Sequence, residues 1–293
     1  MSRFKIGIQL FSLRDEMAKD MDATLKAVSE MGYDCVEFAG YFDHTAEEVK
    51  AMCEKYGLEP VSVHQGHSVF LDNPDESVAY LKTLGVKYCA IPHVAPERWK
   101  EEYDVLIEEI KKVGKLLKDN GIKLMYHNHD FELLIKHGDK YVLDALYEDV
   151  SSDLLLPQLD ECWVHYAGQD PVAYLKKYGN IEEVLHMKDF ECKNLGAGPV
   201  YDLIDDKGKV SDDRKDRESD GFEFRPVGYG RQNVAEIMKA AEDTKVQYII
   251  VEQDQHPERG CMEDAKLSID YIKSLGYLCV EARIVQIHRE PLQ

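Results

Sequence analysis

The sequence lacks the patterns that mark secreted, membrane-spanning and disulfide-stabilised proteins. Its 7 cysteines are scattered and include no CxxC pair, so we interpret them as reduced thiols. No stretch approaches the roughly 20 consecutive apolar residues that a transmembrane helix needs. The first residues run straight into a strand-like segment, without the apolar region or the cleavage site of a signal peptide. We therefore expect a cytoplasmic protein.

Basic residues are also scarce. The 293 residues include 36 Lys and Arg against 56 Asp and Glu, which gives a formal net charge of −20. A surface with this charge repels phosphate backbones and anionic lipid headgroups. We therefore expect neither nucleic acid nor a membrane as a partner.

A glycine follows several amphipathic helical segments, and a short apolar run follows each glycine. This unit recurs at Gly32, Gly57, Gly85, Gly121 and Gly179. Glycine in this place is typical of the left-handed residue that ends a helix. Helices that alternate with apolar runs predict βα units and a parallel sheet. No G-x-G-x-x-G loop follows the first apolar run, which argues against a Rossmann fold.

The apolar runs number eight and predict a closed (β/α)8 TIM barrel, which we expect to form a single domain over residues 1–293. The first run is Ile6 to Leu10, and the others end in polar or turn residues at regular spacing. These ends are Glu37, His64, Pro92, His127, Asp160, His186 and Glu252.

Two segments interrupt the regular spacing. The 66 residues from His186 to Glu252 contain a charged stretch, which predicts a long acidic insertion after strand seven, at about residues 191–224. Loops of this length are usually functional or mobile. The insertion is therefore either a lid over the site or a solvated segment without a role, and it could form a small hairpin. A C-terminal tail, about residues 278–293, packs under the barrel, joins a dimer or is disordered.

Imidazole and carboxylate side chains follow four of the predicted strands directly. His127 and His129 follow one strand, and Asp160, His186 and Glu252 each follow another. The C-terminal ends of barrel strands converge on one site, and these side chains suit a divalent cation. One histidine alone would indicate only a polar layer at the barrel mouth, whereas the whole set predicts a metal site. Because strand side chains alternate, Lys188 shares a face with His186. Further candidates for substrate binding at the mouth are Glu37, His64, His93, Trp163 and Arg225.

Several motifs, taken in order, resemble a known family. They are Tyr126 to Glu132 (YHNHDFE), Gln158 to Asp160 (QLD), Trp163 with Ala167 to Pro171 (AGQDP), Leu185 to Asp189 (LHMKD) and Val251 to Asp254 (VEQD). Together they resemble the sugar phosphate isomerase/epimerase group of the xylose isomerase-like TIM barrels, over roughly residues 4 to 277.

This resemblance implies one divalent ion held by a Glu, an Asp, a His and a Glu. Asp160, His186 and Glu252 match three of these ligands. At the fourth position the chain has His127, so either His127 replaces the family's glutamate or Glu132 reaches in from the loop. We favour Glu132, because it retains the carboxylate. We expect Mn²⁺ first, with Zn²⁺, Co²⁺ and Fe²⁺ as alternatives.

The implied activity is a divalent-metal-dependent sugar isomerase or epimerase that acts on a keto- or aldo-sugar through an enediolate. His127, His129 or a carboxylate at the ion is the candidate base. Lys188 is the candidate for stabilising negative charge or positioning a hydroxyl group. The alternative is a metal-dependent lyase or dehydratase on keto-sugars, inosose or 3-keto-glycosides, including C-glycoside cleavage with a small partner subunit. A DNA-repair endonuclease on the same barrel does not fit the charge of −20. A sugar-binding protein or subunit without turnover remains a third hypothesis, and a homo-oligomer is an alternative to the partner subunit.

Overall fold

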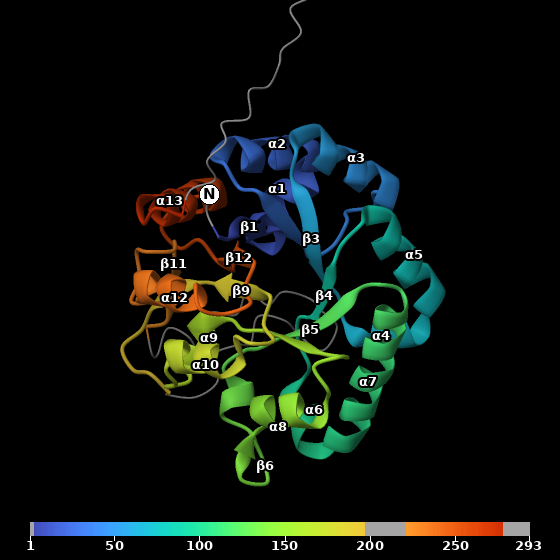
Figure 1. The fold of residues 1–293 in the computed structure, drawn as a ribbon. Coiled ribbons are helices and arrows are strands. Elements are labelled where there is room, and N and C mark those ends of the chain that lie inside the picture. Colours follow the sequence, from blue (N-terminus) through green and yellow to red (C-terminus); the bar gives the residue numbers. More distant parts are fainter. Residues whose placement is uncertain (1–2, 197–220, 278–293) are drawn as a thin grey trace, which may run out of the picture.

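The computed structural model describes residues 3–196 and 221–277, and its centre is a parallel eight-stranded sheet (Figure 1). The strand order is β8-β5-β4-β3-β2-β1-β12-β9. The strand bounds are β1 Lys5–Gln9, β2 Cys35–Phe38, β3 Glu59–His64, β4 Tyr88–Ile91, β5 Lys123–His127, β8 Leu156–Gln158, β9 Val184–Met187 and β12 Tyr248–Val251. The first and last strands in this order, β8 and β9, are joined at their C-terminal ends by a parallel bridge between Asp160 and His186. The ring is thereby closed, and the predicted (β/α)8 barrel is confirmed.

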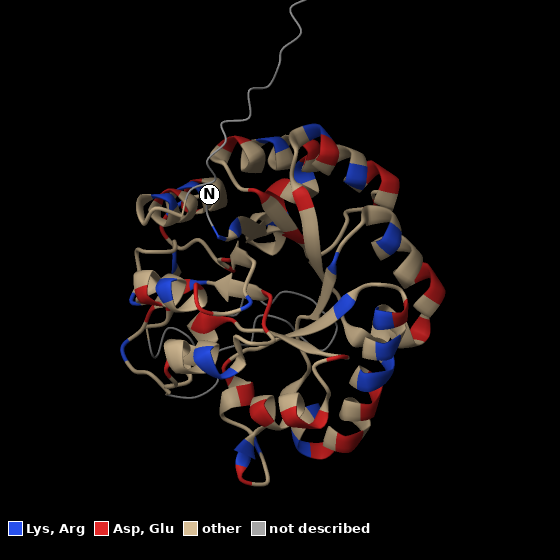
Figure 2. Cartoon of the chain, viewed as in Figure 1, with Lys and Arg blue, Asp and Glu red and all other residues tan. Residues whose placement is uncertain are grey.

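Helices surround the barrel (Figure 1). Their bounds are α1 Arg14–Lys19, α2 Met21–Met31, α3 Ala46–Tyr56, α4 His67–Asp72, α5 Pro74–Leu84, α6 Pro96–Glu101, α7 Tyr103–Asp119, α8 Val142–Asp149, α9 Glu161–Tyr166, α10 Pro171–Tyr178, α12 Val234–Ala241 and α13 Cys261–Ser274. Two short 3₁₀ turns are η1 Leu10–Leu13 and η2 Phe131–Leu133. Figure 2 shows that most of the charged residues lie on these outer helices, as expected for helices that bury only one face.

Glycine is required at the helix ends for two different reasons. Gly32, Gly57 and Gly85 have φ angles of 96°, 63° and 86°, so they adopt the left-handed conformation that the sequence predicts. Gly179 differs, because its φ is −63°. A Cβ atom there would collide with Thr244 and with the carbonyl oxygen of Leu175. Close packing, and not a left-handed turn, therefore requires glycine at this position.

The ends of the predicted insertion form a hairpin of β10 Asp189–Glu191 with β11 Glu223–Arg225. The Asp189 carboxylate accepts hydrogen bonds from the backbone N–H groups of Gly228, Gly230 and Gln232, which fixes the turn after β11. Most of the insertion, residues 197–220, and the predicted tail, residues 278–293, lie outside the described residues. A second small hairpin, β6 Lys136–His137 with β7 Lys140–Tyr141, follows η2. Among the helices that the structure describes, none is long and apolar enough to cross a membrane.

Gly114 lets helix α7 approach the segment that precedes β8. An added Cβ would lie 2.5 Å from the carbonyl oxygen of Leu154. The helix propensity of alanine favours Gly114→Ala by about 1 kcal/mol, but overpacking costs about 1–3 kcal/mol. We therefore expect a net loss of about 1 kcal/mol in the free energy of unfolding, measured by urea denaturation. Lys115→Ala, at the exposed neighbouring position, is the control and should change this free energy by less than about 0.5 kcal/mol. A gain in stability for Gly114→Ala would contradict the close contact.

Candidate metal and substrate site

Four potential ligand side chains meet at the C-terminal ends of four adjacent strands. His127 ends β5, His186 lies on β9, Asp160 lies two residues beyond the end of β8, and Glu252 directly follows β12. These strands are consecutive around the closed ring, in the order β12-β9-β8-β5. One ligand atom from each of the four residues lies within 4.8 Å of the others, and all four side chains are buried. The convergence predicted from the sequence is therefore present, with His127 as its fourth member.

Glu37, near the end of β2, lies beside this group and orients His186 of the group and the neighbouring His64. One Glu37 oxygen is 2.7 Å from His186 Nε2 and 2.8 Å from His64 Nε2. The opposite ring nitrogen of His186, Nδ1, lies 3.1 Å from Glu252. Gln158 and Ser62 donate further hydrogen bonds to Glu37. A carboxylate on the outer nitrogen of a metal-binding histidine fixes its ring orientation and raises its basicity.

Lys188 brings a buried positive charge to the same place. Its ammonium group lies 3.0 Å from Asp160, 2.9 Å from Glu252 and 3.2 Å from Asp254. It also lies 5.3 Å from the centre of the Trp163 ring. Burial disfavours the charged amine, but the three carboxylates outweigh this effect and raise the pKa of Lys188 well above its ordinary value. The side chain is therefore a fixed cation beside two of the potential ligands.

The histidines of the site differ in protonation. Burial disfavours the imidazolium form of His186, but Glu37 and Glu252 raise its pKa to about 10. Burial and the neighbouring positive groups lower the pKa of His127 and of His129 well below the ordinary value. His127 and His129 are therefore neutral at pH 7, the form in which an imidazole binds a metal or accepts a proton.

The donor set fits a divalent cation. His127 turns its Nε2 atom toward the group, 3.7 Å from Asp160, and within residues 3–196 and 221–277 its buried Nδ1 atom has no hydrogen-bond partner. A neutral imidazole has one nitrogen lone pair to offer a ligand. Ligand atoms about 2.0–2.2 Å from an ion lie up to about 4.4 Å apart. The group, which spans 4.8 Å, needs to contract only slightly. Two imidazoles with two carboxylates suit Mn²⁺, Zn²⁺, Co²⁺ and Fe²⁺. His186, which is protonated at pH 7 without a metal, would release the proton of the ring nitrogen that binds the ion.

The structure does not bring Glu132 into this group. Glu132 lies in η2, where its carboxyl oxygens accept hydrogen bonds from the Tyr126 hydroxyl and the His129 backbone N–H, at 2.5 and 2.8 Å. Burial raises the pKa of Glu132 to about 8, so the side chain is mostly neutral at pH 7. Both features oppose the ligand role that the sequence favoured. Glu132 instead supports the strand end that carries His129.

The remaining predicted residues divide into two groups. The rings of His93 and Trp163 lie 5.6 and 5.8 Å from His129, and His64 stacks on His186 at 5.2 Å, so all three border the site. Arg225 lies on β11, where it pairs with Glu223 and with Glu258. None of the contacts described for Arg225 reaches the ligand group.

Asp254 contacts Lys188. The sequence indicates its place at the barrel mouth, because it lies two residues after Glu252 and side chains two apart in a strand share a face. One feature of the site was missed by sequence reasoning. A buried aromatic cluster flanks Lys188 and joins α9 to the β10–β11 hairpin; it contains Trp163, Tyr166, Phe190, Phe222 and Phe224. No sequence periodicity indicates this cluster, because its members come from α9 and from both ends of the insertion.

Glu37→Gln tests the supporting role of this carboxylate. The amide keeps the size of the side chain but removes the charge that holds His186. We expect affinity for Mn²⁺ to fall about 10- to 100-fold, the usual cost of losing such a partner. Calorimetric titration of the metal-stripped protein measures it. Glu59→Gln, at the opposite end of the barrel, is the control. Equal Mn²⁺ affinity in Glu37→Gln and the wild type would rule out the role.

Curated relatives match the chain at low sequence identity. An inosose dehydratase of Clostridium perfringens is 28% identical over 164 residues, which are 54% of this chain and 49% of that protein. The chain thus spans about half the length of this relative. An inosose dehydratase of Mesomycoplasma hyopneumoniae is 24% identical over 277 residues, which are 85% of this chain and 88% of that protein.

Solved structures share its fold. A sugar phosphate isomerase/epimerase from Parabacteroides distasonis superposes with a TM-score of 0.72 at 20% identity, and the match covers 94% of this chain and 96% of that chain. At this identity the likeness concerns the fold alone. The family model of the xylose isomerase-like TIM barrel matches residues 25–278. With the closed barrel and the ligand group at its mouth, this match shows that the chain belongs to the xylose isomerase-like TIM barrel family.

Proposed function

We propose that this chain is a divalent-metal-dependent enzyme that removes a proton beside the carbonyl group of a keto-sugar or keto-cyclitol and then eliminates water. The observation that carries the proposal is the buried group of His127, Asp160, His186 and Glu252, with neutral His129 beside it. Manganese held by these four residues, with Zn²⁺, Co²⁺ or Fe²⁺ as alternatives, would supply Lewis acidity toward the substrate carbonyl. His127 takes the ligand position in place of Glu132.

The residues around the ligand group supply the proton chemistry. The rings of His129 and His127 are 5.2 Å apart, so His129 is close to a substrate bound at the ligands. A neutral buried imidazole is a suitable general base. The Lys188 ammonium can donate to a substrate oxygen that gains negative charge. Trp163 and His93 lie beside His129 and form an amphipathic wall for a sugar or cyclitol ring.

Elimination follows if His129 returns its proton to a leaving group. The C–H proton moves to the imidazole, and the electron pair forms a new C=C bond. The hydroxyl on the next carbon departs with the returned proton as water. The likeness to inosose dehydratases supports this outcome. His127, at the end of β5, is neutral and stands where a glutamate would supply a second ionised carboxylate for epimerisation. Its presence also favours elimination.

The second candidate is isomerisation or epimerisation, in which the proton returns to carbon through an enediolate. It shares the first step and the same residues. The fold likeness to a sugar phosphate isomerase/epimerase supports it. The two candidates differ in whether water leaves.

Proton exchange in D₂O tests the shared first step. The protein, stripped of metal and reloaded with Mn²⁺, is incubated with inosose and with ketohexoses, and NMR follows the C–H signal beside the carbonyl. We expect loss of this signal, with a dehydrated product from inosose. His129→Gln should slow the exchange about 10²- to 10⁴-fold while it keeps its Mn²⁺. His44→Gln, which changes an exposed histidine, should match the wild type.

Two outcomes decide between the candidates. Exchange without dehydration, accompanied by an epimer or an aldose, would replace the dehydratase by the isomerase. No exchange with any of these ketones, in protein shown to contain Mn²⁺, would reject both candidates and favour a sugar-binding role.

A further inference from the structure

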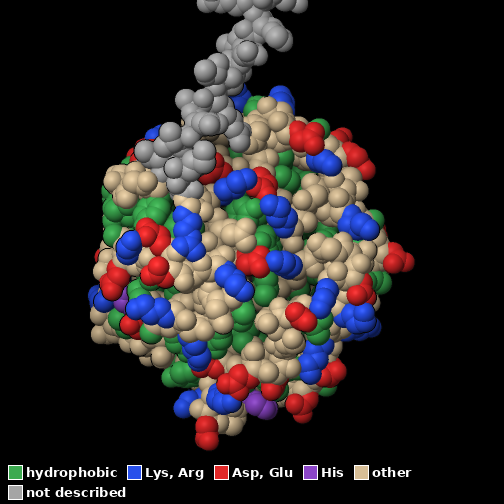
Figure 3. Space-filling view, in the orientation of Figure 1, with side chains coloured by type: hydrophobic (Ala, Val, Ile, Leu, Met, Phe, Trp, Pro, Cys, Tyr) green, Lys and Arg blue, Asp and Glu red, His purple; other side chains and the backbone are tan. Residues whose placement is uncertain are grey.

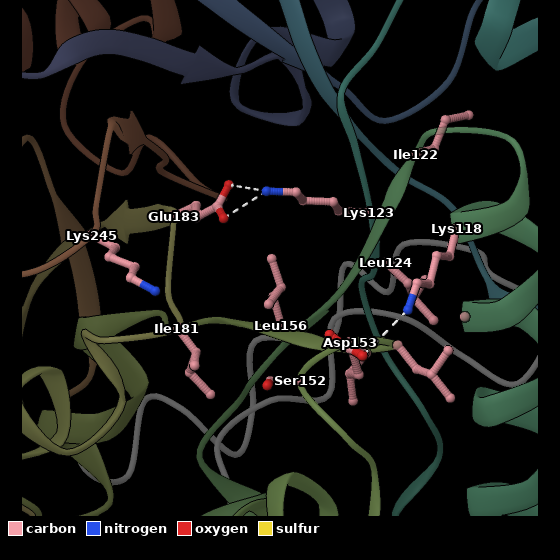
Figure 4. Close-up of a pocket in the computed structure, with 13 residues that line it drawn as sticks. Lys118, Ile122, Lys123, Leu124, Ser152, Asp153, Leu156, Ile181, Glu183 and Lys245 are labelled. Atoms are coloured by element: carbon pink, nitrogen blue, oxygen red, sulfur yellow. Dashed lines mark hydrogen bonds and ion pairs between the residues drawn. The ribbon is translucent and has the colours of Figure 1, made fainter.

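A cavity of ≈360 Å³ lies at the opposite end of the barrel from the ligand group. It opens between the start of β5 and the segments that lead into β8 and β9 (Figure 4). Leu124 lines the cavity, and His127 stands three residues further along β5, which separates the two sites by about 10 Å. The volume lies in the range of about 300–1,000 Å³ that small-molecule pockets occupy.

The strand register creates this cavity. Pairing of β5 with β4 begins at Lys123, whereas pairing of β5 with β8 begins only at Met125 and Leu156. The seam between β8 and β9 is joined at Asp160 and His186, near its C-terminal end. The N-terminal half of this seam is therefore open. Pro157 reinforces the gap, because it lacks the N–H that a strand residue donates to a neighbour.

The wall of the cavity is held in place. The Leu154 carbonyl packs so closely on α7 that only glycine fits at position 114. The turn before β8 is fixed by hydrogen bonds from the backbone N–H groups of Leu154 and Leu155 to the Ser151 carbonyl, at 2.8 and 3.1 Å. The cavity is thus preformed, which lowers the entropic cost of binding a ligand.

The lining combines an apolar surface with a positive charge. Its apolar residues are Ile122, Leu124, Leu154, Leu155, Leu156 and Ile181. Two of its lysines are paired, Lys123 with Glu183 at 2.6 Å and Lys118 with Asp153 at 3.4 Å (Figure 4). These pairs leave no net charge, and Ser152 is the uncharged hydrogen-bonding side chain among the lining residues.

Lys245 is the third lysine, and its charge is not balanced. Within the described residues 3–196 and 221–277, no ion pair or side-chain hydrogen bond holds its ammonium group. Figure 4 shows this group pointing toward the space between Glu183 and Ile181. Many lysines of this acidic chain have a carboxylate partner, and Figure 3 shows basic and acidic side chains close together across the centre of the molecule. An unbalanced lysine at the edge of an apolar cavity is suited to an anion.

We propose that this cavity binds a small organic monoanion, a carboxylate with an apolar body of about the size of a six-carbon chain. The carboxylate would pair with Lys245, and the body would lie on the leucines and isoleucines. A sugar does not fit this lining, because its hydroxyl groups would find few partners and burying them unpaired is costly. The proposal is independent of the activity proposed for the barrel mouth.

Hexanoate is the probe. Calorimetric titration of the whole protein should show saturable binding of hexanoate that is tighter than binding of 1-hexanol, its uncharged counterpart, or of acetate, which lacks the apolar body. Lys245→Met keeps the length of the side chain and removes its charge, and we expect it to weaken hexanoate binding about two- to fivefold. Lys50→Met, at an exposed position on α3, should bind hexanoate like the wild type.

A second variant tests the location. Ser152 is exposed at the edge of the cavity, so Ser152→Trp should block it without disturbing the core, and hexanoate binding should be lost. Equal binding of hexanoate and 1-hexanol, or unchanged hexanoate binding in Lys245→Met, would overturn the charge pairing. Unchanged binding in a folded Ser152→Trp would overturn the site.

Discussion

Replacing His186 by alanine is expected to abolish tight binding of a divalent cation. Its side chain is one of four potential ligands and links Glu37 to Glu252. The affinity for Mn²⁺ should therefore fall by more than the roughly 10- to 100-fold that loss of an outer partner costs. Elemental analysis of purified protein should find about one equivalent of metal in the wild type and almost none in His186→Ala or Glu252→Ala.

The same measurement decides between the two candidates for the fourth ligand. His127→Ala should lose the metal as His186→Ala does, whereas Glu132→Gln should keep it, because Glu132 is engaged with Tyr126 and the His129 backbone. Circular dichroism must show each variant folded. Metal loss in a folded Glu132→Gln, together with retention in His127→Ala, would reverse the assignment. A wild type that takes up none of Mn²⁺, Zn²⁺, Co²⁺ or Fe²⁺ would refute the metal site.

The convergence of Asp160, His186 and Glu252 could be predicted because a parallel barrel has one geometry at its strand ends. A polar residue that ends a buried strand points into the mouth whichever strand carries it. The sequence therefore places these residues without knowledge of the loops. His64 and Glu37 obey the same rule, and both lie beside the ligand group.

Glu132 and Arg225 could not be placed in this way, because loop conformation decides their positions. Glu132 belongs to a 3₁₀ turn that directs it back to Tyr126, and Arg225 belongs to a hairpin formed by residues from both ends of the insertion. The cavity at the opposite end of the barrel could not be predicted from the sequence either. It depends on where pairing begins between β5 and β8, and composition carries no signal for a register.

Lys188→Met should lower the stability of the metal-free protein but keep the metal site, whereas His186→Ala should lose the metal. The ammonium group offsets three buried carboxylates, those of Asp160, Glu252 and Asp254. Without it these groups repel one another, and removal of one partner from a buried ion pair costs about 3–5 kcal/mol. In the presence of a chelator, we expect the melting temperature to fall by about 10 °C, at about 2–4 °C per kcal/mol for a chain of this size.

A divalent cation should reverse most of this loss. Lys188 shares Asp160 and Glu252 with the proposed metal, so removal of its charge leaves both carboxylates to the cation, and the gain in melting temperature on adding Mn²⁺ should exceed that of the wild type. Proton exchange on inosose should nevertheless fall, because the donor to the substrate oxygen is missing. Lys188→Arg keeps the charge but adds volume at a buried position, so its melting temperature should fall less than that of Lys188→Met. If Lys188→Met with chelator melts like the wild type, the carboxylates are not held together by this lysine, and its place in the site must be reassigned.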